Sequence, residues 1–274
     1  MKTLVLHSLK TSAAKKLALE LRGEIEVRKS HFRIHTKKDF DIENFRLSNN
    51  FDLNIFDNNF DYQNIKLMVS DMDSTLITVE TIDEVAKEVG LKDEISLITE
   101  AAMQGHLDFT ESFKKRLSIL KGVSNSSFES VYNKKVEFSP GAKVLIEYFK
   151  SNQIRTAVVS GGLSFFAKKL QSQLGIDNCR ANNVEIINQS ITGNVIGNVI
   201  DAKEKAKYID ELCDQYKLKN NQVIAIGDGA NDIEMMKVAG LSVAYHAKPI
   251  LKQYCDIQIN YGSLASLIDF FVDA

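Results

Sequence analysis

The chain has 274 residues, of which 44% are hydrophobic and 26% are charged, and its formal net charge is −2 at pH 7. This composition is typical of a globular protein long enough to bury one large core or two modest ones. The small net charge gives no electrostatic basis for binding nucleic acid. No stretch approaches the roughly 18 consecutive apolar residues of a membrane span, and the first apolar run ends at His7, too short for a secretory signal.

Three cysteines, Cys179, Cys213 and Cys255, lie far apart and show no spacing typical of metal ligands. An odd, unclustered set favours reduced thiols, so we expect a cytoplasmic protein. The expected partner is a small molecule, with neither nucleic acid nor membrane, and a homodimer is left open.

The first part of the chain, residues 1–62, is expected to form a small α+β unit that ends in a linker. Apolar residues recur with helical spacing over 12–21. Residues 39–62 are rich in Asp, Asn and Phe, which predicts an irregular segment with one short strand. The strands expected in this unit are residues 2–6, 24–27, 32–35 and 52–56.

A chemically distinctive pattern begins at residue 65, where a short apolar strand (65–70) runs directly into Asp71 and Asp73. In open α/β sheets, ligands bind at the carboxyl ends of the strands. Two acids spaced two apart at such a position indicate a nucleophile or metal ligand with an acid/base partner. The alternative is an ordinary Asx turn after the strand.

Residues 80–137 show helical periodicity and no strand-like run, which predicts a small helical bundle inserted after the first core strand. From Pro140 onward strands alternate with helices, as in a doubly wound parallel sheet. Peripheral β-hairpins are expected over 183–199, where apolar and polar residues alternate around glycines. The predicted fold class is therefore α/β, with a core of residues 63–79 and 138–274 and an inserted helical cap at 80–137.

A second acidic strand end follows the apolar residues 222–227, where Asp228 and Asp232 enclose a Gly-Ala-Asn turn. Together with Asp71 and Asp73, these acids suit a hard divalent cation such as Mg²⁺, which takes carboxylate oxygens as ligands. The alternative is a Gly-Asp turn between a strand and a helix.

Two further features suit a phosphate group. Ser160-Gly161-Gly162 follows a strand expected at 154–159, and its hydroxyl and backbone N–H groups can hold phosphate oxygens, although a plain turn is the alternative. Lys205 opens a predicted helix, where a cation opposes the helix dipole and an anionic ligand would explain its presence. The alternative for Lys205 is a solvated side chain in a Lys-rich run.

In order along the chain, Asp71–Thr75, Ser160–Gly162, Lys205 and Gly227–Asp232 resemble the four motifs of the haloacid dehalogenase superfamily of phosphohydrolases. Three further stretches are similar to the phosphoserine phosphatase family within it: Glu80–Glu84, Arg116–Lys121 and Ala247–Pro249. The resemblance covers residues 64–270 and implies the core fold with an inserted cap. It does not extend to the N-terminal unit.

The resemblance implies a mechanism. Asp71 would be the nucleophile that forms an aspartyl-phosphate, and Asp73 would be the general acid and base. Asp71, Asp228 and the backbone carbonyl of Asp73 would hold Mg²⁺, with Asp232 orienting this cluster. The residues that would bind the phosphate are Ser160, Gly161, Lys205 and Asn231.

In the cap, Glu80 and Arg116 would bind the ammonium and the carboxylate of an amino-acid substrate, since arginine can hold a carboxylate bidentately. Met103 and Phe109 would line the substrate.

Structural alternatives exist for all four cap residues, because most charges on helices are solvated. Glu80 fits a solvated helix start, and Arg116 fits a surface ion pair with Asp108 or Glu111. By periodicity alone, the methionine and the phenylalanine fit core positions.

The expected function is Mg²⁺-dependent hydrolysis of O-phospho-L-serine to L-serine and phosphate, in serine biosynthesis. Two alternatives stay open. One is a same-fold phosphatase or phosphotransferase acting on another small phosphomonoester, such as phosphohomoserine or a sugar phosphate. The other is a protein that only binds a ligand, against which Asp71 and Asp73 argue because binding needs no acid/base carboxylate. Glu80 with Arg116 favours phosphoserine.

Overall fold

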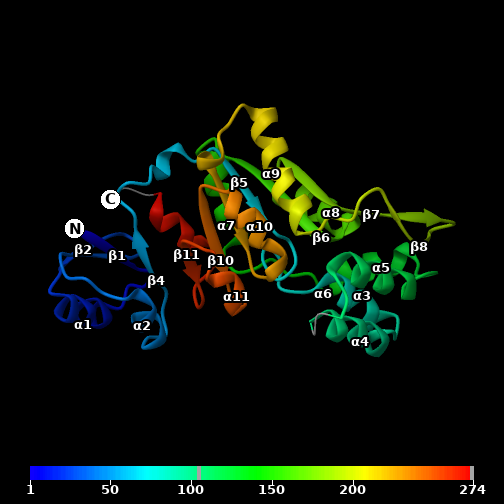
Figure 1. Cartoon of the computed structure of the whole chain (residues 1–274), viewed down its shortest axis with the longest axis horizontal. Helices are drawn as coiled ribbons and strands as arrows, with labels where there is room; N and C mark the ends of the chain where they lie inside the picture. Colours follow the sequence, from blue (N-terminus) through cyan, green and yellow to red (C-terminus); the bar gives the residue numbers. More distant parts are fainter. Residues whose placement is uncertain (104–105, 272–274) are drawn as a thin grey trace.

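The computed structural model describes residues 1–103 and 106–271, without the side chain of Met103. Its core is a seven-stranded sheet, with a four-stranded N-terminal unit at one end of the molecule and a helical cap at the other (Figure 1). We use "N-terminal unit" for β1 to β4 and "cap" for α3 to α6.

The core sheet has the strand order β11-β10-β9-β5-β6-β7-β8. All neighbouring pairs are parallel except the terminal β7–β8 hairpin. The chain leaves β5 toward β6 and returns later to β9 on its other side, so the switch in strand order lies between β5 and β9, where ligands bind in such sheets. The strands are β5 (Leu67–Ser70), β6 (Arg155–Leu163), β7 (Asn178–Ile187), β8 (Ser190–Ile196), β9 (Val223–Gly227), β10 (Leu241–Tyr245) and β11 (Ile257–Ile259).

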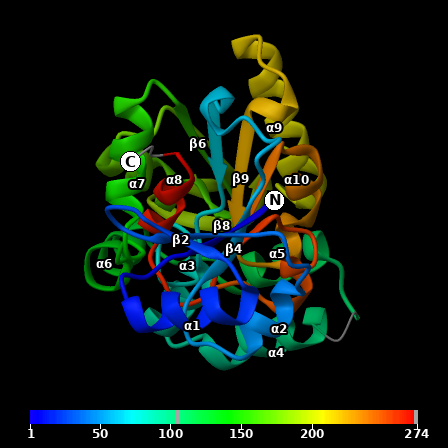
Figure 2. The ribbon, with the colours of Figure 1, turned by 90° about the vertical axis from the view of Figure 1, so that its left-hand side faces the viewer.

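Helices cover both faces of this sheet. Figure 2 shows α7 (Ala142–Ser151) and α8 (Ser164–Leu174) on one side, and α9 (Ala202–Tyr216) and α10 (Ile233–Val238) on the other. Alternation along β5 follows from this arrangement, because successive side chains point to opposite faces. Met68 packs in the core beneath α7 and α8, while Leu67 and Val69 pack beneath α9 and α10. The prediction of a doubly wound α/β core is confirmed.

The segment between β5 and β6 contains the four cap helices, as the helical periodicity predicted: α3 (Thr81–Glu88), α4 (Lys92–Met103), α5 (Phe109–Ile119) and α6 (Asn125–Lys135). The β7–β8 hairpin reaches the cap through backbone hydrogen bonds, of which Gly122 N to Ile191 O is 2.8 Å long. Only one hairpin forms in the predicted 183–199 region, and β7 also extends the core sheet by pairing with β6.

The N-terminal unit is an antiparallel sheet of order β2-β3-β1-β4 with α1 (Thr11–Leu21) packed on it. Its strands are β1 (Lys2–Leu6), β2 (Glu24–Val27), β3 (Phe32–Thr36) and β4 (Leu53–Phe56), which confirms the four predicted strands. The irregular segment contains one helix that we did not predict, α2 (Ile42–Leu47). Asp41 caps it by accepting a hydrogen bond from Glu43 N (3.0 Å).

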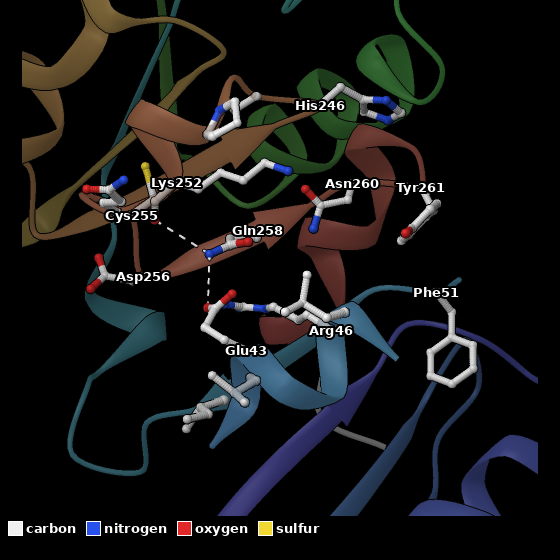
Figure 3. Close-up of a pocket in the computed structure, with 16 residues that line it drawn as sticks. Glu43, Arg46, Phe51, His246, Lys252, Cys255, Asp256, Gln258, Asn260 and Tyr261 are labelled. Atoms are coloured by element: carbon white, nitrogen blue, oxygen red, sulfur yellow. Dashed lines mark hydrogen bonds and ion pairs between the residues drawn. The ribbon is translucent and has the colours of Figure 1, made fainter. Parts of the chain in front are cut away.

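The N-terminal unit docks onto the end of the core sheet through β4. Asn54 bonds the backbone N and O of Gln258 in β11 (2.8 and 3.0 Å), and Asp52 accepts a bond from Asn260 N (2.6 Å). Beside this junction, α2 and the short helix α11 (Pro249–Lys252) border a cleft of about 960 Å³, in which the Gln258 amide lies between Glu43 and Lys252 (Figure 3).

Among the helices in residues 1–103 and 106–271, none combines the length and the apolar character needed to cross a bilayer.

Candidate active site

Two loops that follow core strands and the C-terminal end of a third strand meet beneath the cap and border a cavity of about 820 Å³. The loop after β5 brings Asp71 and Asp73, the loop after β9 brings Asp228 and Asn231, and the end of β6 brings Ser160. The cap closes the cavity from the other side with residues of α3, α4 and α5. The predicted strand-end residues therefore lie together.

Asp71 is held in place as β5 ends. Its backbone N–H donates to Ile226 O of β9 (2.9 Å), so the pairing of the two strands continues to this residue. Its Oδ1 accepts hydrogen bonds from Met72 N (2.8 Å) and from Lys205 Nζ (2.9 Å). No hydrogen bond reaches Asp71 Oδ2 from the described residues, so one carboxylate oxygen is left for another partner.

Lys205 lies in the first turn of α9 and is fully buried, so the alternative of a solvated lysine is wrong. Its Nζ also donates to Asp232 Oδ1 (2.7 Å). Although burial by itself disfavours the ammonium, the contacts with Asp232 and Asp71 raise the pKa of Lys205 above its usual value. A cation therefore stays fixed beside Asp71.

Asp232 is buried and saturated with hydrogen bonds. While Oδ1 faces Lys205, Oδ2 accepts from Asp228 N (3.1 Å) and Gly229 N (3.2 Å). Both oxygens are thus used to shape the loop after β9, which supports the orienting role expected for Asp232.

Asp228 has the opposite character. Its carboxylate is nearly buried and accepts no hydrogen bond from the described residues. Oxygens of Asp71, Asp228 and Asp232 lie within 4.8 Å of one another. Burial and the charge of Asp232 raise the pKa of Asp228 to about 7 and that of Asp71 to about 8. Such a surplus of carboxylate oxygens fits a hard divalent cation, which would offset the repulsion.

Asp73, two residues after Asp71, faces α3. Its carboxylate accepts hydrogen bonds from Thr81 N (3.3 Å) and Thr81 Oγ1 (3.2 Å). Burial, followed by the charges of Glu80 and Asp71, raises the pKa of Asp73 well above its usual value. A Cβ at Gly162 would lie 2.7 Å from Asp73 Oδ2, so a larger residue here would displace the Asp73 carboxylate. The site therefore favours the protonated form of Asp73 more than water does.

The C-terminal end of β6 carries the predicted phosphate-binding groups. The strand expected at 154–159 extends to Leu163, so Ser160–Gly162 lie within it rather than in a turn after it, at an irregularity in its pairing with β7. Ser160 is buried at the cavity wall, and its Oγ accepts a bond from Gly162 N (2.9 Å). Behind this end of β6, the buried amide of Asn182 donates to Gly161 O (2.8 Å) and accepts from Ile200 N (2.8 Å). Asn182 thereby connects the Ser160 end of β6 to the segment that leads into α9 and Lys205.

Glu80 and Arg116 face the cavity from the cap. Glu80 precedes α3, is exposed, and accepts a bond from Ser74 Oγ (2.8 Å). Arg116 makes no ion pair with Asp108 or Glu111, which instead form the capping box of α5, so the surface ion-pair alternative is wrong. Burial lowers the pKa of Arg116, and nearby acids partly restore it.

Phe109 combines both roles considered for it. Its ring packs against the core, stacks on Phe113 (6.4 Å between centroids) and lines the cavity. It also lies over Gly161, where a Cβ would approach Phe109 Cζ to 2.5 Å. The side chain of Met103, the other predicted wall residue, lies outside the described residues.

Sequence analysis gave no role to three further residues of the site: Asp83, Asn182 and Lys248. Asp83 and Lys248 line the cavity, and Lys248 N donates to Asp228 O (2.8 Å). Both stand inside stretches that carry the resemblance, which is the only signal that could have marked them. Nothing in the sequence around Asn182 distinguishes it from other asparagines in strands.

The family model of haloacid dehalogenase-like hydrolases matches residues 68–237, and the chain belongs to this family. Within it, the chain is 43% identical over 209 residues to a phosphoserine phosphatase from Polaromonas sp., covering 74% of this chain and 89% of the relative. This relative and others like it assign the chain to the phosphoserine phosphatases, as the resemblance implied.

Two solved structures extend the comparison. A HAD family hydrolase from Salmonella enterica serovar Typhi is 28% identical with a TM-score of 0.91, covering 100% of this chain and 99% of that one. The N-terminal unit therefore has a structural counterpart. A substrate-bound phosphoserine phosphatase is 36% identical with a TM-score of 0.70, covering 76% of this chain and 99% of that one.

Proposed function

We propose that this protein hydrolyses O-phospho-L-serine to L-serine and phosphate in serine biosynthesis, with Asp71 as nucleophile, Asp73 as acid and base, and Mg²⁺ as cofactor. One observation carries the proposal. A carboxylate with a free oxygen (Asp71) and a protonatable carboxyl group (Asp73) share one cavity with an opposed acid and base, Glu80 and Arg116.

The first half-reaction uses the free oxygen of Asp71. Asp71 Oδ2 attacks phosphorus, the bond from phosphorus to the serine oxygen breaks, and the proton of Asp73 passes to that oxygen as it leaves. In the second half-reaction Asp73 takes a proton from the attacking water, and the aspartyl-phosphate bond breaks to regenerate Asp71. Splitting one displacement into two lets the same carboxyl group act first as acid and then as base.

The phosphate would lie against positive and N–H groups. Ser160, the backbone of Gly161, and Asn231 border the cavity, and Lys205 holds Asp71 from behind. Transfer of a phosphoryl group depends mainly on positioning and on neutralising charge. Mg²⁺, held by Asp71, Asp228 and the Asp73 carbonyl, would supply charge neutralisation, and Asp232 would orient those ligands.

The cap would select the amino-acid head group. Glu80 would accept hydrogen bonds from the ammonium, and Arg116 would hold the carboxylate with two N–H groups, while Phe109 and Met103 would pack beside it. Hydrogen bonds to charged groups contribute about 1.5–3 kcal/mol, so Arg116→Ala or Glu80→Gln should lower kcat/KM for phosphoserine roughly 10- to 150-fold. Arg116→Lys should recover only part of the loss.

A turnover panel tests the proposal. Phosphoserine, phosphohomoserine, a sugar phosphate and p-nitrophenyl phosphate would be compared with Mg²⁺ and after chelation by EDTA. We expect phosphoserine to have the highest kcat/KM and chelation to abolish turnover. A higher kcat/KM for another member of the panel would replace phosphoserine as the substrate, and turnover that survives chelation would remove Mg²⁺ from the proposal.

We also propose a cytoplasmic location, supported by free Cys179, Cys213 and Cys255. A homodimer is a further proposal, which light scattering of the purified protein would test.

A further inference from the structure

Asp83 lines the active-site cavity but has no role in the function proposed above. It lies in the first turn of α3, and Arg116 faces the same cavity from α5. Asp83 Oδ1 is buried without a hydrogen-bond partner in the described part of the chain, and the same holds for Arg116 Nε. Two residues that line a single cavity thus carry a buried unpaired acceptor and a buried unpaired donor. Unpaired buried polar atoms are destabilising, so such a complementary pair indicates a contact that forms in a functional state.

The charges around Arg116 point to the same pair. Three acids attract its guanidinium, and Asp83 does so more strongly than Glu80 or Asp73. Glu80 already accepts a hydrogen bond from Ser74, whereas Oδ1 of Asp83 is free. Asp83 is therefore the acid best placed to fix the orientation of the guanidinium.

We propose that Asp83 is a positioning residue that sets Arg116 for the substrate carboxylate, an inference that rests on the proposed amino-acid head group. A guanidinium presents its five N–H donors in a rigid planar fork. When its Nε side bonds Asp83, its two Nη groups point away together and hold a carboxylate bidentately. Asp83 acts through Arg116 and does not touch the substrate.

Four substrates with different head groups distinguish a positioning role of Asp83 from direct binding and from a structural role. Phosphoserine carries both an ammonium and a carboxylate, phosphoethanolamine only the ammonium, phosphoglycolate only the carboxylate, and p-nitrophenyl phosphate neither. In Asp83→Asn we expect kcat/KM to fall about 10- to 100-fold for the two carboxylate substrates, mainly through KM. Turnover of the other two should stay unchanged.

A double-mutant cycle tests the coupling directly. In the Arg116→Ala background, adding Asp83→Asn should cause no further loss on phosphoserine, because residues that act as one unit are not additive. Glu84→Gln is the matched control, since it removes the same charge from the next residue of α3, which pairs with Lys87. It should leave all four substrates unaffected.

Each other outcome overturns the proposal in a distinct way. Equal losses on all four substrates, with a lowered thermal midpoint, mean a structural role. Losses confined to phosphoserine and phosphoethanolamine mean that Asp83 binds the ammonium, and additive losses in the cycle remove the coupling. If the wild-type protein shows no preference for phosphoserine, the proposed function is refuted instead. In that case, the effect of Asp83→Asn on kcat/KM for phosphoglycolate relative to p-nitrophenyl phosphate still tests whether Asp83 positions Arg116.

Discussion

Two buried clusters that contain aspartates differ in how the chain compensates their negative charge. At the junction of the N-terminal unit with the core, Asp269 accepts hydrogen bonds from His7 Nδ1 (2.8 Å) and Ser30 Oγ (2.5 Å), and His31 Nδ1 lies 3.2 Å from it. Burial alone would raise the pKa of Asp269, but the bonds from His31 and His7 lower it below its usual range. The fold thus stabilises this charge.

In the active site, by contrast, Asp71 and Asp228 have raised pKa values, because Lys205 does not offset their burial and the negative charges of the acids beside each of them. A charge that the folded chain leaves uncompensated indicates a ligand, whereas a fully paired one indicates architecture. Cavity volume is a poorer guide to ligand binding than uncompensated charge. The junction cleft is comparable in volume to the active-site cavity, yet its Arg46 already bonds Leu53 O (2.9 Å) and Asn54 Oδ1 (2.7 Å).

The strongest test of this contrast is Asp71→Asn. The amide is nearly isosteric but a poor nucleophile, so we expect kcat to fall by on the order of 10⁴-fold or more. The same change removes one charge from a repelling cluster, so the metal-free variant should unfold at a higher temperature than wild type. Trapping of a phosphoryl group on another residue, or a lowered midpoint, would contradict the assignment.

Asp73→Asn should separate the acid from the nucleophile. Loss of a general acid costs roughly 10²- to 10⁴-fold, and the full loss is expected for phosphoserine, whose leaving alkoxide needs a proton. An aryl phosphate has a leaving group that barely needs one, so its turnover should fall far less. Parallel kcat measurements on both substrates provide the check. Equal losses would mean that Asp73 is only a structural or metal-binding residue.

At the junction, Asp269→Asn should produce the reverse pattern. Breaking a buried pair typically costs about 3–5 kcal/mol of unfolding free energy, while kcat/KM at 25 °C should stay unchanged. Because the pKa of Asp269 is lowered in the folded state, the stability that Asp269 contributes is present above pH 3.8, its ordinary pKa. This stability is lost as the pH falls through the pKa of the folded state. Urea unfolding at neutral and acid pH measures both effects.

Asp39→Asn is the matched control for the junction variant, because this exposed acid of the N-terminal unit pairs with Lys2 (2.8 Å). Solvent screens such an exposed pair, so its loss should change the unfolding free energy very little. If the two variants lost equal stability, or if Asp269→Asn lost activity at 25 °C, the distinction between the two clusters would be wrong.

The parts of this molecule that could be predicted from sequence are those encoded locally. Apolar runs ending in Asp71 and Asp228 specify both a buried strand and the sheet edge at which it ends, so the strand-end half of the site follows from pattern. The helical spacing of residues 80–137 likewise predicted the cap helices. In the N-terminal unit, α2 was missed because a segment of six residues is too short to show helical periodicity.

The remaining features depend on tertiary contacts. Asn182 lies near the Ser160 end of β6 only because β7 pairs with β6, and the junction acid Asp269 meets histidines more than 200 residues away. Asp83 is one acid among several on a helix that the sequence marks as solvated. Only the packing of α3 against the cavity shows that one of its oxygens is buried and unpaired.

The smallest effect concerns Mg²⁺ binding to the unliganded protein. A ligand that binds only the folded state at 100 times its Kd adds about 2.7 kcal/mol of stability, so Mg²⁺ alone should raise the thermal midpoint of wild type. Asp228→Asn should lose that shift, and Asp269→Asn should keep it. Because the pKa of Asp228 is raised to about 7 in the folded state, Asp228 lowers the stability of the metal-free protein increasingly as the pH rises from 3.8 to 7. Asp228→Asn should lack this decline in stability. If Mg²⁺ still raised the thermal midpoint of Asp228→Asn, the cation would bind elsewhere. The inference that uncompensated charge marks the ligand site would then be wrong.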